Sequence, residues 1–209
     1  LRERLGDHVA QKGSLVSPEY LRFDFSHQKP VNADELAMIE ADVNKRIRDN
    51  VEVLTRQMTP DEAQDAGATA LFGEKYGEEV RVVSMGARAE EGCELLYSME
   101  LCGGTHVTRT GDIGFFKVTS EVAVASGVRR IEAVTGEAAL QHVGSRDAII
   151  AETAKSLNAA PGDVPARVGA LLQERRAMER EMSDLRRKLA EGGSGTNAPE
   201  VRDVNGMSM

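Results

Sequence analysis

The chain has 209 residues, of which 41% are hydrophobic and 29% charged, and its formal net charge is −8. This composition indicates a globular protein rather than a disordered one, and no apolar run approaches the roughly 20 residues of a membrane-spanning helix. The acidic balance argues against general coating of nucleic acid but allows a local basic track. Two cysteines, Cys93 and Cys102, are too few for a disulfide framework, and no signal peptide is recognisable, so we expect a cytoplasmic protein without a membrane partner.

The first part of the chain predicts a mainly β core. Leu1–Leu5 is expected to be the last turn of a helix that is already under way, which suggests an excerpt from a longer protein. Asn32 followed by Glu35 indicates a capped helix start, and an apolar stripe of helical spacing runs from there to Ile47. Thr59 and the proline after it predict a second, short helix. The expected strands are 9–16, 21–25, 51–58, 80–85, 94–99, 115–119 and 128–134, in one mixed sheet core.

The chain after Gly136 predicts helices. Ala138–Leu157 is expected to form one helix, and a long helix begins near Val164 after a Pro-Gly break. Positions 164, 168, 171, 175, 178, 182, 185 and 189 of the long helix form a heptad seam that is apolar except at Arg175. We expect a hairpin with the preceding helix, another subunit being the alternative. The predicted fold class is α+β: a mixed or antiparallel sheet domain with packed helices (1–136), a helical hairpin arm like a coiled coil (137–190), and a linker with the start of a carboxy-terminal domain (191–209).

The motif richest in chemistry is Cys102-Gly-Gly-Thr-His106. A thiolate and an imidazole at this spacing can reach one zinc ion from a tight turn. The glycines are expected to let the backbone approach closely and adopt conformations that other residues avoid. Two ligands do not make a zinc site, and a buried cysteine beside a turn histidine is the structural alternative. Two further motifs follow, Thr110-Gly-Asp-Ile-Gly114 and Gly127-Val-Arg-Arg-Ile-Glu-Ala-Val-Thr-Gly136.

In this order and spacing, the motifs resemble the editing domain of bacterial alanyl-tRNA synthetase. The first half of that domain is matched by His8-Val-x-Gln11-Lys-Gly-Ser-Leu-Val16 and by Leu21-Arg-Phe-Asp-Phe-Ser-His27, and the resemblance extends to about Leu189. It implies an alanine–tRNA ligase, which attaches alanine to tRNA-Ala with ATP and whose editing domain hydrolyses tRNA-Ala mischarged with serine or glycine. A pocket for alanine rejects these amino acids only about 10–200-fold, so a second, hydrolytic site is needed.

The resemblance also implies zinc bound by Cys102 and His106 together with an H-x-x-x-H pair. That pair is expected upstream of Leu1, so the site is incomplete here and we expect the isolated chain to be inactive. His8 and His27 are not natural substitutes, because they lie at a strand start and a strand end and are nineteen residues apart. ATP and magnesium would belong only to the absent aminoacylation domain.

Four residues are implied as part of the hydrolytic pocket. Gly103, Gly104 and Thr105 would offer backbone N–H groups and a hydroxyl near the aminoacyl group, with a purely structural turn as the alternative. Gln11 matches a polar position that faces the pocket. It could bond the hydroxyl of the misattached amino acid, or it could be an exposed strand residue.

Arg129 and Arg130 are the candidate tRNA contacts. Since they are adjacent on a predicted strand, they face opposite sides. One could meet phosphates near the tRNA end while the other pairs with Glu132 or Glu121. A purely structural pair is the alternative reading. Subunits could also associate through the absent carboxy-terminal domain.

Two other kinds of protein fit the same residues. A freestanding trans-editing deacylase shares the motifs, although the heptad helix and the linker after it point toward a further domain. A non-catalytic tRNA-binding module with a structural metal would bind tRNA and leave mischarged tRNA intact. Loss of a structural metal should unfold the domain, whereas loss of a catalytic ion should spare most of the fold.

Overall fold

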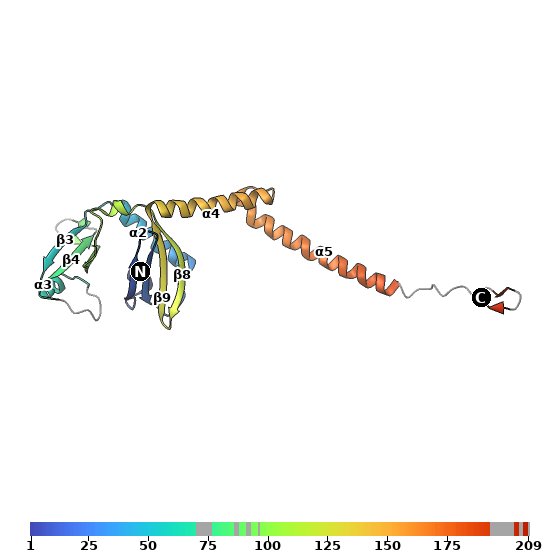
Figure 1. The fold of residues 1–209 in the computed structure, drawn as a ribbon, viewed down its shortest axis with the longest axis horizontal. Helices are drawn as coiled ribbons and strands as arrows, with labels where there is room; N and C mark the ends of the chain where they lie inside the picture. Colours follow the sequence, from blue (N-terminus) through green and yellow to red (C-terminus); the bar gives the residue numbers. More distant parts are fainter. Residues whose placement is uncertain are drawn as a thin grey trace. The chain divides into compact units, whose positions relative to one another are not determined.

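The chain forms two compact units, Leu1–Ser145 and Arg146–Met209, in the computed structural model described here (Figure 1). The structure describes residues 1–69, 77–85, 88–90, 93–95, 97–192, 203–204 and 207–208. Among these residues, no helix combines the length and apolar character needed to cross a membrane.

The first unit contains a four-stranded antiparallel sheet in the order β1-β2-β9-β8. The predicted strands are confirmed, with β8 extending further than expected because it forms a long hairpin with β9. The turn of that hairpin contains Gly127, whose φ of +70° is in the region that favours glycine. The bounds are β1 (Gln11–Val16), β2 (Leu21–Ser26), β8 (Phe116–Ala125) and β9 (Val128–Thr135).

One long helix, α2 (Ala33–Arg48), packs on this sheet. The predicted capping box is confirmed: Asn32 Oδ1 accepts from the backbone N–H of Glu35 (2.9 Å), and the Asn32 N–H donates to the Glu35 carboxylate (2.9 Å). A short helix, α1 (Arg2–Leu5), precedes β1, as expected. The core of buried side chains between these elements consists of Val9, Phe25, Val31, Ile39 and Ile131.

A second, three-stranded antiparallel sheet has the order β3-β4-β7, with strands β3 (Leu54–Met58), β4 (Val80–Met85) and β7 (Ser98–Leu101). Helix α3 (Pro60–Asp65) follows the predicted cap at Thr59 and packs with Val80, Val82 and Leu101 through Ala63.

Two expectations about the strands are wrong. The core contains separate sheets rather than one, and the strand expected at 94–99 is two strands with different partners: β6 (Cys93–Leu95) pairs with β5 (Arg88–Glu90), whereas β7 pairs with β4. The apolar pattern specifies which face of a strand is buried, but it does not specify the hydrogen-bonding partner.

The helices expected after Gly136 are confirmed as α4 (Gly136–Ser156) and α5 (Val164–Gly192), with a 3-10 turn, η2 (Pro161–Asp163), between them. The seam residues of α5 are exposed except for the half-buried Val164: Met178 is 62% exposed and Leu189 75%. The described residues therefore show two helices and a break, with no cover on the α5 seam. Two short strands, β10 (Asp203–Val204) and β11 (Met207–Ser208), pair near the end of the chain.

Candidate functional site

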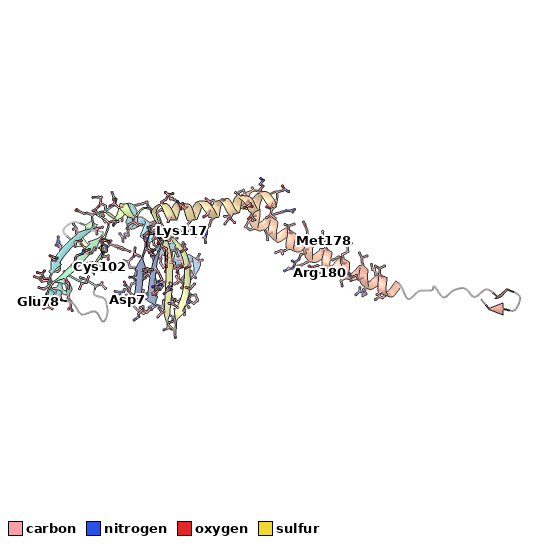
Figure 2. The ribbon with its side chains drawn as sticks, viewed as in Figure 1. Asp7, Glu78, Cys102, Lys117, Met178 and Arg180 are labelled. Carbon is pink, nitrogen blue, oxygen red and sulfur yellow. The ribbon has the colours of Figure 1, made fainter. Side chains whose placement is uncertain are left out.

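The Cys102–His106 turn begins directly after β7, beside the second sheet (Figure 2). Cys102 is a free, half-buried cysteine, and its Sγ lies 3.2 Å from Nε2 of the exposed His106. A tetrahedral zinc ion with bonds of about 2.3 Å to sulfur and about 2.0 Å to nitrogen separates these two atoms by about 3.5 Å. The pair therefore fits two corners of a zinc site after an opening of a few tenths of an ångström.

The remaining corners are not supplied by any neighbouring side chain that the structure describes. Within the described residues, no group of three or more His, Cys, Asp or Glu side chains could hold a metal ion.

Gly103 and Gly104 were expected to allow close approach of the backbone and conformations that other residues avoid, and the structure shows neither feature. Neither Gly103 nor Gly104 has a positive φ. A Cβ added at Gly103 would meet nothing within 4 Å, and one added at Gly104 would make an ordinary contact, 3.6 Å from Cys102 Sγ. What the glycines provide here is open backbone: the N–H groups of Gly103, Gly104 and Thr105 make no hydrogen bond to another described residue.

His106 and Thr105 line a pocket of ≈ 380 Å³, which falls within the range of small-ligand sites. Three polar residues of the opposite wall, Glu52, Thr55 and Arg81, were not expected at the site. They lie far from the motif in sequence. Thr55 and Arg81 reach it because β3 and β7 both pair with β4, and Glu52 reaches it through its β-bridge to Arg109. No local pattern in the sequence could have indicated this. Gln11 is half-buried, does not line the pocket, and donates to Ser14 Oγ (3.3 Å).

The Thr110–Gly114 motif fastens the far end of the loop that starts at Cys102. The Thr110 hydroxyl is buried, donates to the Arg46 carbonyl (3.0 Å) and accepts from the Val51 N–H (3.0 Å). Asp112 accepts from the backbone N–H of Arg109 (2.9 Å) and from the Thr108 hydroxyl (2.9 Å). These bonds tie the loop to the end of α2 and to the segment before β3.

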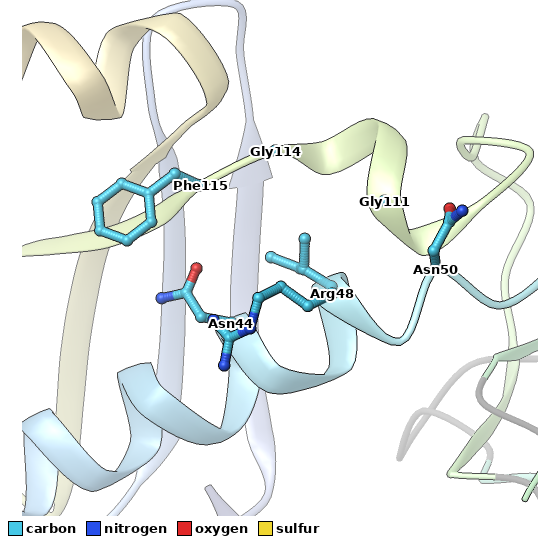
Figure 3. Close-up of a pocket in the computed structure, with 7 residues that line it drawn as sticks. Asn44, Arg48, Asn50, Gly111, Gly114 and Phe115 are labelled. Atoms are coloured by element: carbon cyan, nitrogen blue, oxygen red, sulfur yellow. The ribbon is translucent and has the colours of Figure 1, made fainter.

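Packing against the side chain of Asn50 requires glycine at position 111. A Cβ at this position would lie 2.4 Å from Oδ1 of Asn50, so any other residue would force the asparagine to move. Figure 3 shows the segment Gly111–Phe115 passing over the end of α2, with Asn44, Arg48 and Asn50 on the other side of a pocket of ≈ 340 Å³. The motif is thus a structural fastening of the loop rather than a second chemical site.

His8 and His27, placed by sequence at a strand start and a strand end, lie side by side. The distance from His8 Nε2 to His27 Nδ1 is 2.8 Å and the rings stack with centroids 5.1 Å apart. The pairing of β1 with β2, in which Gln11 lies opposite Phe25, brings them together. Their joint position was missed because it depends on strand register.

Arg129 and Arg130 are each held by a carboxylate. Arg129 donates to both oxygens of Glu121 (2.5 and 2.6 Å), one of the two partners expected. Arg130 donates to both oxygens of Asp24 (2.7 and 2.8 Å) rather than to Glu132. These hydrogen bonds raise the pKa of Arg129 and lower the pKa of Asp24. The register of β2 and β9, which sets Asp24 opposite Arg130, explains the partner that the sequence missed.

Comparison with known proteins gives a consistent result. Residues 80–132 match the family described as threonyl and alanyl tRNA synthetase second additional domain. The chain is 59% identical over 204 residues to the alanine–tRNA ligase of Granulibacter bethesdensis, covering 98% of the chain and 23% of that protein. It is 56% identical to the alanine–tRNA ligases of Rhizorhabdus wittichii and Paramagnetospirillum magneticum, covering 99% and 100% of the chain and 23% and 22% of those proteins.

The matched family segment contains β4, β7, the Cys102–His106 turn and most of the β8–β9 hairpin. The chain spans a little under a quarter of the length of these curated relatives. Over nearly its whole length, the chain is thus similar to a segment of these alanine–tRNA ligases, and residues 80–132 of the chain match the second additional domain.

Proposed function

We propose that this chain is the editing part of an alanine–tRNA ligase and hydrolyses the ester bond of tRNA-Ala mischarged with serine or glycine. The observation that carries the proposal is the Cys102–His106 pair, whose Sγ and Nε2 lie 3.2 Å apart and whose histidine lines a pocket, within a segment 59% identical to an alanine–tRNA ligase. The need for such a site follows from the weak discrimination that size alone gives between alanine and its smaller or hydroxylated analogues.

Cys102 and His106 would hold the zinc ion, with two further ligands from the upstream histidine pair. When bound, zinc would supply a positive charge that polarises the ester carbonyl or orients a water molecule. In the reaction, water adds to the carbonyl carbon, the bond to the ribose oxygen breaks, and that oxygen takes up a proton.

The turn itself offers hydrogen-bond donors for the developing negative charge on the carbonyl oxygen. Gly103 and Gly104 are exposed, their N–H groups make no hydrogen bond to another described residue, and Thr105 lines the pocket. Donors of this kind, fixed in place before the reaction, commonly contribute a factor of about 10²–10³ each. In this proposal Gln11 selects for the hydroxyl of serine, and it would have to turn toward the pocket to do so.

The context of the whole enzyme is also part of the proposal. Its partners would be tRNA-Ala and the mischarged seryl and glycyl forms, and ATP with magnesium would be used only in the aminoacylation domain. Arg129 and Arg130 would reach tRNA only by sharing their guanidinium groups with Glu121 and Asp24. The cytoplasm is the proposed location.

In the arm, α5 is proposed to pack its apolar seam against another helix rather than to leave it exposed to solvent. The exposed seam of α5, which includes Met178, Leu185 and Leu189, suits cover by α4 in a hairpin. Association of subunits through the carboxy-terminal domain is the alternative source of cover.

The test uses the full-length ligase and compares hydrolysis of seryl-, glycyl- and alanyl-tRNA-Ala by the wild type and His106→Ala. The proposal expects the wild type to clear the first two and spare the third, and the variant to lose this clearance while alanine activation continues. Equal hydrolysis by both proteins would refute it. Unfolding of the domain on zinc removal would favour a structural metal instead.

A further inference from the structure

Within the described part of the chain, the side chain of Arg81 donates a hydrogen bond from outside to the turn that carries Cys102 and His106. We propose that Arg81 is a positioning residue for this pair, which sets the distance between the sulfur and the imidazole before the metal binds. The inference rests on the proposed function, since it assigns Arg81 a role toward the same zinc ion.

Arg81 contacts the turn twice from β4. Its backbone carbonyl accepts from the N–H of Cys102 (3.0 Å), and its Nη2 donates to the carbonyl of Gly104. The first contact fixes the residue that supplies the thiolate. The second fixes the middle of the turn, two residues before the imidazole of His106.

The second contact matters because little else restrains the middle of the turn. A Cβ added at Gly103 would meet nothing within 4 Å, one added at Gly104 would make only an ordinary contact with Cys102 Sγ (3.6 Å), and the N–H groups there make no hydrogen bond to another described residue. Glycine loses more backbone freedom on ordering than any other residue. The hydrogen bond from Arg81 to the Gly104 carbonyl therefore restricts the backbone between Cys102 and His106 and limits the range of distances between their side chains.

The two ends of the loop that starts at Cys102 are held by different hydrogen bonds. The effect of Arg81 on the metal ligands can therefore be distinguished from an effect on the stability of the whole loop. The far end is tied by the Val53 N–H to the Thr108 carbonyl (2.9 Å) and by Thr110 to Val51 (2.9 Å). Those bonds do not involve Arg81. Removing the Arg81 side chain should therefore loosen the near end of the loop, where the metal ligands are, and leave the far end in place.

Residues that orient metal ligands without touching the metal typically change metal affinity or activity by about 10–100-fold when they are replaced. We expect a change of this size for Arg81→Met, which retains the aliphatic stem and removes the donor. Arg81→Lys keeps a donor at the end of a similar stem and should recover most of the loss. Arg56→Gln, an exposed arginine on the neighbouring strand β3, is the matched control and should behave as the wild type.

The experiment uses the full-length ligase with its upstream histidines. Zinc affinity is measured by competition with a chelator, the thiolate–metal absorption is recorded after substitution with Co²⁺, and hydrolysis of seryl-tRNA-Ala and alanine activation are measured alongside. The expected result is weaker metal binding, an altered cobalt spectrum and slower hydrolysis in Arg81→Met, rescue in Arg81→Lys, and unchanged alanine activation.

Wild-type metal affinity and hydrolysis in Arg81→Met would overturn the inference. So would an Arg81→Met protein that fails to fold, since Arg81 would then be a structural residue. Cys102→Ala, measured in parallel, separates this failure from failure of the proposed function. If Cys102→Ala loses zinc and hydrolysis while Arg81→Met keeps both, only the role of Arg81 is wrong. If Cys102→Ala keeps hydrolysis, the proposed function itself is wrong.

Discussion

Asn44 is the polar residue on which the docking of α2 depends, and its replacement by alanine should strongly destabilise the first unit. It is 6% exposed, its amide Nδ2 donates to the carbonyls of Glu40 (2.9 Å) and Phe116 (2.8 Å), and its Oδ1 accepts from the Phe116 N–H (2.9 Å). Asn44→Ala leaves the N–H and the carbonyl of Phe116 without these partners. Each half-buried polar group left unsatisfied costs about 1–3 kcal/mol, so we expect a loss of about 3 kcal/mol.

Urea unfolding followed by circular dichroism measures this loss. With an m-value of about 2 kcal/mol/M, a loss of about 3 kcal/mol lowers the midpoint of the first unit by about 1.5 M. The neighbouring exposed residue Lys45 provides the control, since Lys45→Ala removes a side chain from the same helix without touching β8. A midpoint for Asn44→Ala within about 0.3 M of the Lys45→Ala value would refute the reasoning, because it would mean that water replaces the asparagine at no cost.

Three further outcomes are expected. Arg130 holds the pKa of Asp24 below its unfolded value of about 3.9. This pair therefore contributes its full stability above about pH 3.9 and loses it as the pH falls through the folded pKa; Asp24→Asn should flatten the acid limb of a stability–pH curve, and an unchanged limb would contradict the assignment. Leu185→Asp should lower the melting temperature of the helical arm alone. A single transition at a lower temperature for the whole chain would show that the arm is part of the main core. The isolated chain, with only Cys102 and His106 as zinc ligands, should lose its zinc on dialysis against a mild chelator; stoichiometric retention would reveal further ligands.

Features that depend on residues close in sequence could be predicted well. Both helix caps, at Asn32 and Thr59, are present as expected, since a capping box requires only a pair three residues apart. The break before α5 and its start at Val164 follow equally from local proline and glycine. The Cys102–His106 pair is of the same kind, because four positions along a tight turn suffice to bring the two side chains together.

Features that depend on strand pairing could not be predicted from the sequence. Arg81 reaches Gly104, His8 meets His27, and Asp24 takes Arg130 only because particular strands are neighbours in a particular register. Apolar alternation does not carry that information. The same gap explains why one sheet was expected where the structure has separate sheets.

The apolar stripe of α2 could not identify Asn44 as a buried residue. The predicted apolar stripe of α2 included Ile39 and Ile47, which are buried, but it passed over Asn44, which is buried as well. A polar residue on a helix is ordinarily assigned to solvent. Here its three hydrogen bonds make burial favourable, and the two to Phe116 follow only from the position of β8.

The measurement that tests the central claim most directly is single-turnover hydrolysis of seryl-tRNA-Ala by the full-length ligase carrying Cys102→Ala, with zinc content determined on the same samples. The claim predicts a loss of at least about a hundredfold, since a metal site displaced by about 1 Å can cost that much in rate, together with reduced zinc, an intact fold and unchanged alanine activation. Cys93→Ala, at the other cysteine, should hydrolyse the substrate as the wild type does. Wild-type hydrolysis by Cys102→Ala would contradict the assignment of this turn to editing.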